Sequence, residues 1–137
     1  YKRQAIAWTL KIAEMMEAEI TALHVQDTYL KQFYNEIYAQ GRQEYLDHVD
    51  QELRKHSIVT FSQFEAKVKQ RKIVHYTIMK TGDPLEEIMK EFREGSYDLI
   101  VVGGKPLKGI KTIKSRNIPA KLASKIKKGA LFIIRGN

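Results

Sequence analysis

The chain of 137 residues contains no cysteine and only three prolines. The lack of thiols excludes a disulfide scaffold, cysteine-ligated zinc, iron–sulfur clusters and thiol catalysis, and it fits a reducing cytosol. Long hydrophobic runs are also missing, since the longest extend over Leu99–Gly104 and Ala130–Ile134. These runs are far shorter than the roughly 18 residues that a membrane-spanning helix needs. We therefore expect a cytoplasmic protein without membrane insertion.

Acidic residues are absent from the last part of the chain. All 16 Asp and Glu residues lie at or before Asp98. The net charge of the whole chain is +8. The cations that follow Asp98 are Lys105, Lys108, Lys111, Lys114, Arg116, Lys121, Lys125, Lys127, Lys128 and Arg135. This asymmetry indicates either an anionic partner for this end, such as a nucleotide phosphate, nucleic acid or an anionic surface, or a solvated lysine face.

The overall composition is that of an ordinary globular domain. Hydrophobic residues make up 43% of the chain and charged residues 29%, which excludes disordered and low-complexity classes. The length corresponds to one domain by the usual prior of about 100–200 residues per domain. We therefore treat residues 1–137 as a single domain.

Hydrophobic periodicity predicts alternating helices and strands. The expected helices cover residues 3–17, residues 28–70 (as one helix or two, with weak points at Gly41 and at residues 58–60), a segment that begins at Pro84, and Ile118–Lys127. The expected strands are Ile20–Val25, Ile73–Lys80, Tyr97–Val102 and Ala130–Arg135. Strands separated by helices imply right-handed crossovers and a parallel sheet with helices on both faces. The predicted fold is an α/β layer sandwich.

Two helices carry clear start signals. Asp83, Pro84 and Glu86 fit the N-cap, N1 and N3 positions of a capping box. Asn117 can cap the last helix, whose first turn tolerates Pro119.

The end of the strand before Gly103 is the most suggestive place for a ligand, because ligands bind at the carboxyl ends of strands in open parallel sheets. Gly103 and Gly104 end this strand in the prediction, and a lysine-rich loop connects them to the helix that starts after Asn117. Glycines allow close approach of the backbone, and helix N-termini offer N–H groups to phosphate. The combination predicts an anion site.

No catalytic or metal site is indicated. The four histidines lack the spacing of metal ligands, and no Ser/His/Asp constellation is recognisable from spacing. The glutamates that follow Pro84 are interpreted as a solvated helix face.

The chain resembles the universal stress protein family along almost its whole length. The most specific stretch is TGDPLEEIMKEFREGSYDLIVVGG at 81–104, and ITALHVQD at 20–27, residues 5–13 and residues 117–135 complete the pattern. The resemblance implies a Rossmann-like three-layer sandwich with a parallel sheet of strand order 3-2-1-4-5. It also implies a homodimer and, in one branch of the family, binding of ATP (with Mg).

The phosphate motif of the family is only partly present. That motif reads Gly, two residues, Gly, nine residues, Gly, then Ser or Thr; laid on this sequence it matches Gly103, but its other positions fall on Pro106, Arg116 and Asn117. The resemblance places adenine at Val25. The phosphate side is expected at Gly103, Gly104, Lys105, Pro106, Arg116, Asn117 and Ile118. We expect a degenerate ATP site in which lysine and arginine side chains replace lost backbone donors.

Other functions stay open. The domain could have kept the fold but lost ATP binding, and it could then act by protein–protein contact as a regulatory domain of a larger protein. Alternatively, it could be a slow ATP hydrolase. The third alternative is binding of nucleic acid by the basic C-terminal face, although nucleic acid is the less expected partner. The resemblance implies a homodimer interface at the last strand, through Ala130, Leu131, Phe132, Ile133 and Ile134. The change Ile133→Lys is then expected to give monomers.

The family opens with a strand that ends in an adenine-contacting aspartate, and this sequence begins after it. That strand is central in the family's sheet, between the second and the fourth. We expect the chain to be a fragment or trimmed product of a protein of roughly 150 residues, with a rearranged four-stranded sheet as the alternative.

Overall fold

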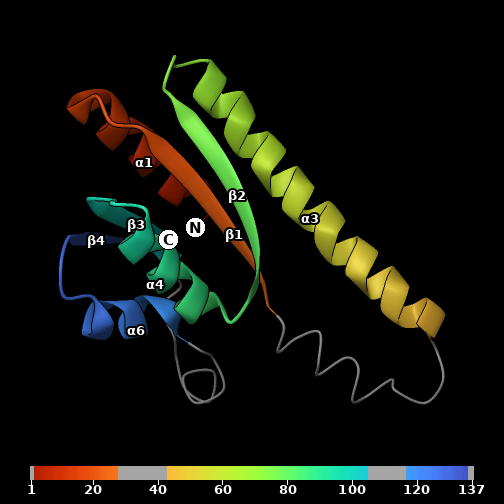
Figure 1. The fold of residues 1–137 in the computed structure, drawn as a ribbon. Coiled ribbons are helices and arrows are strands. Elements are labelled where there is room, and N and C mark those ends of the chain that lie inside the picture. Colours follow the sequence, from red (N-terminus) through yellow and green to blue (C-terminus); the bar gives the residue numbers. More distant parts are fainter. Residues whose placement is uncertain (1, 28–42, 105–116, 136–137) are drawn as a thin grey trace. The chain divides into compact units, whose positions relative to one another are not determined.

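The computed structural model describes residues 2–27, 43–104 and 117–135 (Figure 1). Helices and strands alternate throughout the described residues. In chain order they are α1 (Lys2–Met16), β1 (Ile20–Asp27), α3 (Gln43–Lys69), β2 (His75–Gly82), α4 (Pro84–Glu94), β3 (Leu99–Gly104), α6 (Ile118–Lys125) and β4 (Ala130–Arg135).

The chain divides into two compact units, residues 19–87 and residues 1–18 with 88–137. We call them the β1–β2 unit and the β3–β4 unit, and we describe each by itself. In the β1–β2 unit the two strands pair in parallel, from Ile20 opposite His75 to Asp27 opposite Gly82. Helix α3 covers this pair by placing Phe61 against the ring of His24 and Phe64 against the ring of His75.

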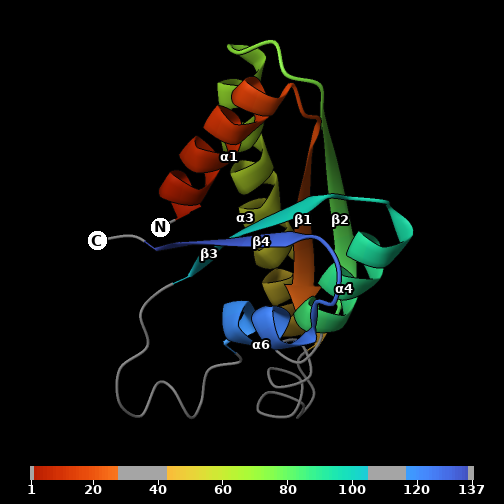
Figure 2. The ribbon, with the colours of Figure 1, turned by 90° about the vertical axis from the view of Figure 1, so that its left-hand side faces the viewer.

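The β3–β4 unit is also built on a parallel strand pair. Its register runs from Leu99 opposite Ala130 to Gly104 opposite Arg135. Helices α1 and α6 both contact β3 and β4, and they lie on opposite sides of the pair in the two views (Figures 1 and 2). The helices bury Leu10, Ala13 and Leu122. This unit therefore has the layering of an α/β sandwich.

The parallel α/β architecture expected from the sequence is confirmed. The pairs β1–β2 and β3–β4 are the neighbours that the order 3-2-1-4-5 requires for its second and third and its fourth and fifth strands. In the described residues the strands pair as β1–β2 and as β3–β4, in two two-stranded sheets.

The long helix is continuous where a break was considered. Helix α3 runs without interruption through residues 58–60. The β-branched residues there lower helix propensity only slightly, and the helix buries Ser57, Phe64 and Val68 along one side. Burial therefore outweighs local propensity. The other considered break, at Gly41, lies outside the described residues.

Strand boundaries differ from the prediction by about two residues. Strand β3 begins at Leu99 and includes both Gly103 and Gly104, whereas the sequence indicated Tyr97–Val102. The glycines belong to the strand because they pair with Ile134 and Arg135 of β4. Strand β1 likewise continues to Asp27, because its pairing with β2 continues to Gly82. Pairing with a neighbour, which local sequence does not reveal, sets these ends.

Candidate functional site

The carboxyl end of β3 lies against the first turn of α6. A Cβ atom built on Gly104 would stand 3.3 Å from Cγ of Pro119 and 3.3 Å from Cγ2 of Ile133. Such distances are tighter than ordinary contacts, so a side chain at position 104 would push the helix away from the strand. The glycine, expected to admit a ligand, serves here to let α6 pack closely. We call this junction the β3–α6 corner.

The start of α6 is capped as the sequence predicted. The side-chain oxygen Oδ1 of Asn117 accepts a hydrogen bond of 3.4 Å from the N–H of Ala120, and its carbonyl accepts one of 3.1 Å from Lys121. Asn117 itself is in the left-handed region, at φ 38° and ψ 59°, a conformation that asparagine tolerates better than most residues.

This capping reduces what the helix start can offer to phosphate. Among the first three residues of α6, Pro119 has no N–H and the N–H of Ala120 is bonded to Asn117. The remaining residue of this turn is Ile118, which has an N–H that is not bonded to Asn117. A helix start normally provides several such donors to an anion, so the backbone contribution here is weak.

The structure brings together part of the predicted site. Gly103 and Gly104 end β3, and Asn117 and Ile118 begin α6, so these four residues meet at the β3–α6 corner. Three predicted residues, Lys105, Pro106 and Arg116, lie outside the described residues. Val25, the expected adenine contact, belongs to the β1–β2 unit.

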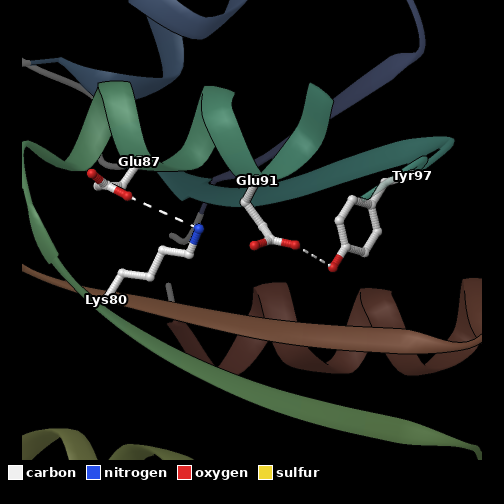
Figure 3. Close-up of polar contacts among 4 residues, drawn as sticks. All are labelled: Lys80, Glu87, Glu91 and Tyr97. Carbon is white, nitrogen blue, oxygen red and sulfur yellow. Dashed lines mark hydrogen bonds and ion pairs between the residues drawn. The ribbon is translucent and has the colours of Figure 1, made fainter. Parts of the chain in front are cut away.

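Val25 has a charged neighbour that the sequence did not single out. It lies opposite Lys80 in the β1–β2 register, and Nζ of Lys80 is 4.0 Å from Oε2 of Glu87 (Figure 3). Both side chains are only 24% exposed, so the pair is better shielded from water than a surface ion pair. The cation next to Val25 is thus engaged with a carboxylate.

Gly82 leaves room for the side chain of Glu87. It has a φ of +156°, and a Cβ there would meet Cγ of Glu87 at 3.0 Å. The next residue, Asp83, accepts a hydrogen bond of 3.1 Å at Oδ2 from the N–H of Glu86. The predicted capping by Asp83 is therefore confirmed. Cap and glycine together set the start of α4, and with it the carboxylate that faces Lys80.

The described residues contain no group of three or more His, Asp and Glu side chains that could hold a metal ion. In the same part of the chain, no helix combines the length and the apolar character needed to cross a membrane.

Known proteins resemble this chain both in sequence and in fold. The sequence model of the universal stress protein family matches residues 1–132. A solved structure titled "Structure-based assignment of the biochemical function of hypothetical protein MJ0577: A test case of structural genomics" is similar in fold, with a TM-score of 0.69 and 17% sequence identity. The match covers 98% of this chain and 90% of that chain. No curated protein sequence matches.

The family match spans nearly the whole chain, and the structure shows the parallel α/β architecture that the resemblance implies. The chain belongs to the universal stress protein family.

Proposed function

We propose that this chain is a cytoplasmic stress-response domain that binds ATP weakly, through a degenerate site at the β3–α6 corner. The observation that carries the proposal is the close packing of Gly104 on Pro119. This packing holds the end of β3 beside Asn117 and Ile118, which is where an anion site of an open parallel sheet is expected.

Side-chain cations would supply most of the binding. In the sequence, Lys105 directly follows Gly104 and Arg116 directly precedes Asn117. The backbone donors at the corner are reduced by Pro119 and by the cap. A charge-assisted hydrogen bond to phosphate contributes about 1.5–3 kcal/mol. Two such contacts give weak, salt-sensitive binding of ATP with Mg²⁺.

Calorimetric titration with MgATP tests this proposal. The double change Lys105→Ala with Arg116→Ala should weaken binding at least about tenfold, and higher salt should weaken the wild type as well. The matched control is Lys67→Ala with Lys69→Ala, which removes the same charge from exposed positions of α3 and should leave the affinity unchanged. Absence of any binding heat in the wild type would contradict the proposal. Steady phosphate release above a protein-free control would add slow hydrolysis to it.

A second candidate is an interaction module that works without nucleotide, as a homodimer formed through β4. In the described residues β4 pairs with β3 along one edge only, and Phe132 on this strand is 43% exposed. An apolar strand with an open edge favours pairing with another chain. Sedimentation of the wild type at micromolar concentration, with and without MgATP, tests this candidate.

The structure corrects the substitution chosen from sequence to test the dimer. Ile133 is half-buried, and its Cγ2 would lie 3.3 Å from a Cβ on Gly104. It therefore packs toward α6, and Ile133→Lys would disturb folding as well as association. Phe132, on the opposite side of β4, is the residue to change.

A further inference from the structure

The surface of α6 and the turn after it carries four exposed lysines, Lys121, Lys125, Lys127 and Lys128, which we call the α6 lysine face. Among the residues that the structure describes, no ion pair joins any of the four to a carboxylate. Two lysines elsewhere do pair with carboxylates, since Lys55 lies 3.7 Å from Glu52 and Lys80 lies 4.0 Å from Glu87. Within the described residues, the α6 lysine face is thus a cluster of four exposed cations without an ion pair.

This arrangement works against the stability of the isolated domain. Lys121 and Lys125 are one helical turn apart, a spacing at which like charges repel. One cation near the end of a helix is favourable to the helix dipole, and Lys125 satisfies that role in the last turn of α6. Lys127 and Lys128 follow the C-cap Ile126 and lie near the same helix end, whereas Lys121 lies in the middle of α6 and has no such role. A partner of opposite charge would relieve the repulsion.

The helix that carries the face is anchored to the β3–β4 pair, and its other exposed side chains are short. Leu122 is completely buried and Pro119 packs at the position of Gly104, so α6 is fixed on the β3–β4 pair. The other exposed residues of α6 are Ala120, Ala123 and Ser124, all with short side chains. No bulky group separates the ammonium groups from a broad, flat surface.

We propose that the α6 lysine face adsorbs this domain electrostatically to an anionic lipid membrane surface. Between Ile118 and Gly129 the chain has no arginine, no aromatic residue and no amide side chain. Fork-shaped arginine contacts, amide contacts to adenine and aromatic stacking on bases all depend on those residues. Lysines acting as point charges suit diffuse attraction to anionic headgroups, and the small residues between them favour adsorption without insertion.

Co-sedimentation of the full chain with vesicles tests the proposal. Vesicles with roughly 30 mol% phosphatidylglycerol in phosphatidylcholine should bind the protein at low salt, and pure phosphatidylcholine vesicles should not. Binding should fall when salt rises from about 0.05 M to about 0.3 M, because the Debye length shortens. Each lysine removed should lower the partition coefficient about fivefold, so Lys121→Gln with Lys125→Gln should lower it about 25-fold.

The matched control is Lys67→Gln with Lys69→Gln, which makes the same charge change on exposed positions of α3. It should change partition by no more than about twofold. The control variant should melt at the wild-type temperature, because its side chains are exposed. The α6 variant should melt at that temperature or slightly above it, because the repulsion between Lys121 and Lys125 is removed. MgATP titration of the α6 variant should match the wild type, which separates this proposal from the nucleotide site.

Three results would overturn the proposal. The first is unchanged vesicle binding by the α6 variant, which would place the lipid-binding cations elsewhere. The second is equal binding to neutral and anionic vesicles. The third is tighter binding to a short DNA duplex than to anionic vesicles at the same salt, lost in the α6 variant, which would reassign the face to nucleic acid.

Discussion

The hydroxyl of Tyr97 donates a hydrogen bond of 2.8 Å to Oε2 of Glu91 (Figure 3). Glu91 is on the last turns of α4, and the chain turns back at Gly95 and Ser96 before it reaches the tyrosine. A Cβ atom on Gly95 would overlap the ring of Tyr97. The glycine thus lets Tyr97 fold back onto α4. This explains why β3 begins only at Leu99, although Tyr97 has high strand propensity.

The close approach of Tyr97 to Gly95 predicts an effect on stability. Gly95→Ala should lower the free energy of unfolding by about 1–3 kcal/mol, because the ring must move and the bond to Glu91 is lost. Urea denaturation measures this change. In a Tyr97→Ala background the same Gly95→Ala change should have little effect, since the overlapping ring is gone. Equal costs in both backgrounds would show that the overlap is not the cause.

Gly129 combines a positive φ with a crowded position. Its φ is +89°, and a Cβ there would stand 2.6 Å from Cζ of Phe92 and 3.2 Å from the carbonyl oxygen of Asp98. Gly129→Ala should therefore destabilise the protein by about 2–4 kcal/mol, from backbone strain and overpacking together. With Phe92→Ala present, the overpacking is relieved and only about 1–2 kcal/mol should remain. A Gly129→Ala protein as stable as wild type would refute this assignment.

Lys72 occupies a position after α3 that favours glycine. Its φ is +54°, in the left-handed region where a side chain is unfavourable and where helix-ending glycines are common. Lys72→Gly should therefore raise the free energy of unfolding by about 0.5–1 kcal/mol. The control is Lys69→Gly, which removes the same side chain inside the last turn of α3 and should cost about 1 kcal/mol. Thermal denaturation shows whether each substitution stabilises or destabilises the protein, and a destabilising Lys72→Gly would contradict the prediction.

Phe132 tests the homodimer. Its side chain is 43% exposed on β4, so Phe132→Lys removes apolar area and adds a charge without entering the core. If β4 forms the interface, Phe132→Lys should shift a dimeric wild type to monomers in sedimentation, with little change in the melting of the monomer. Met15, which is 84% exposed on α1, gives the control change Met15→Lys, which should leave the dimer intact. A wild type that is monomeric at micromolar concentration would remove this candidate.

Some features of the candidate site could be predicted because they depend on neighbours in sequence. The caps at Asp83 and Asn117 were correctly assigned because a cap joins a side chain to an N–H three residues later. The parallel architecture could be predicted too, because apolar runs separated by helices leave few other topologies. The role of Gly104 was predicted incompletely. Its role in packing depends on Pro119, which lies in a different element.

The sequence by itself determined the class of fold, the family, the helix starts and the concentration of positive charge after Asp98, since all of these are written in local patterns. Only the tertiary structure decided that Lys80 faces Glu87 beside Val25, that Ile133 packs inward while Phe132 is exposed, and that the α6 lysines have no acidic neighbour among the described residues. These relationships depend on contacts between different helices and strands. Strand register and helix packing determine these relationships, and the periodicity within one segment predicts neither the register nor the packing.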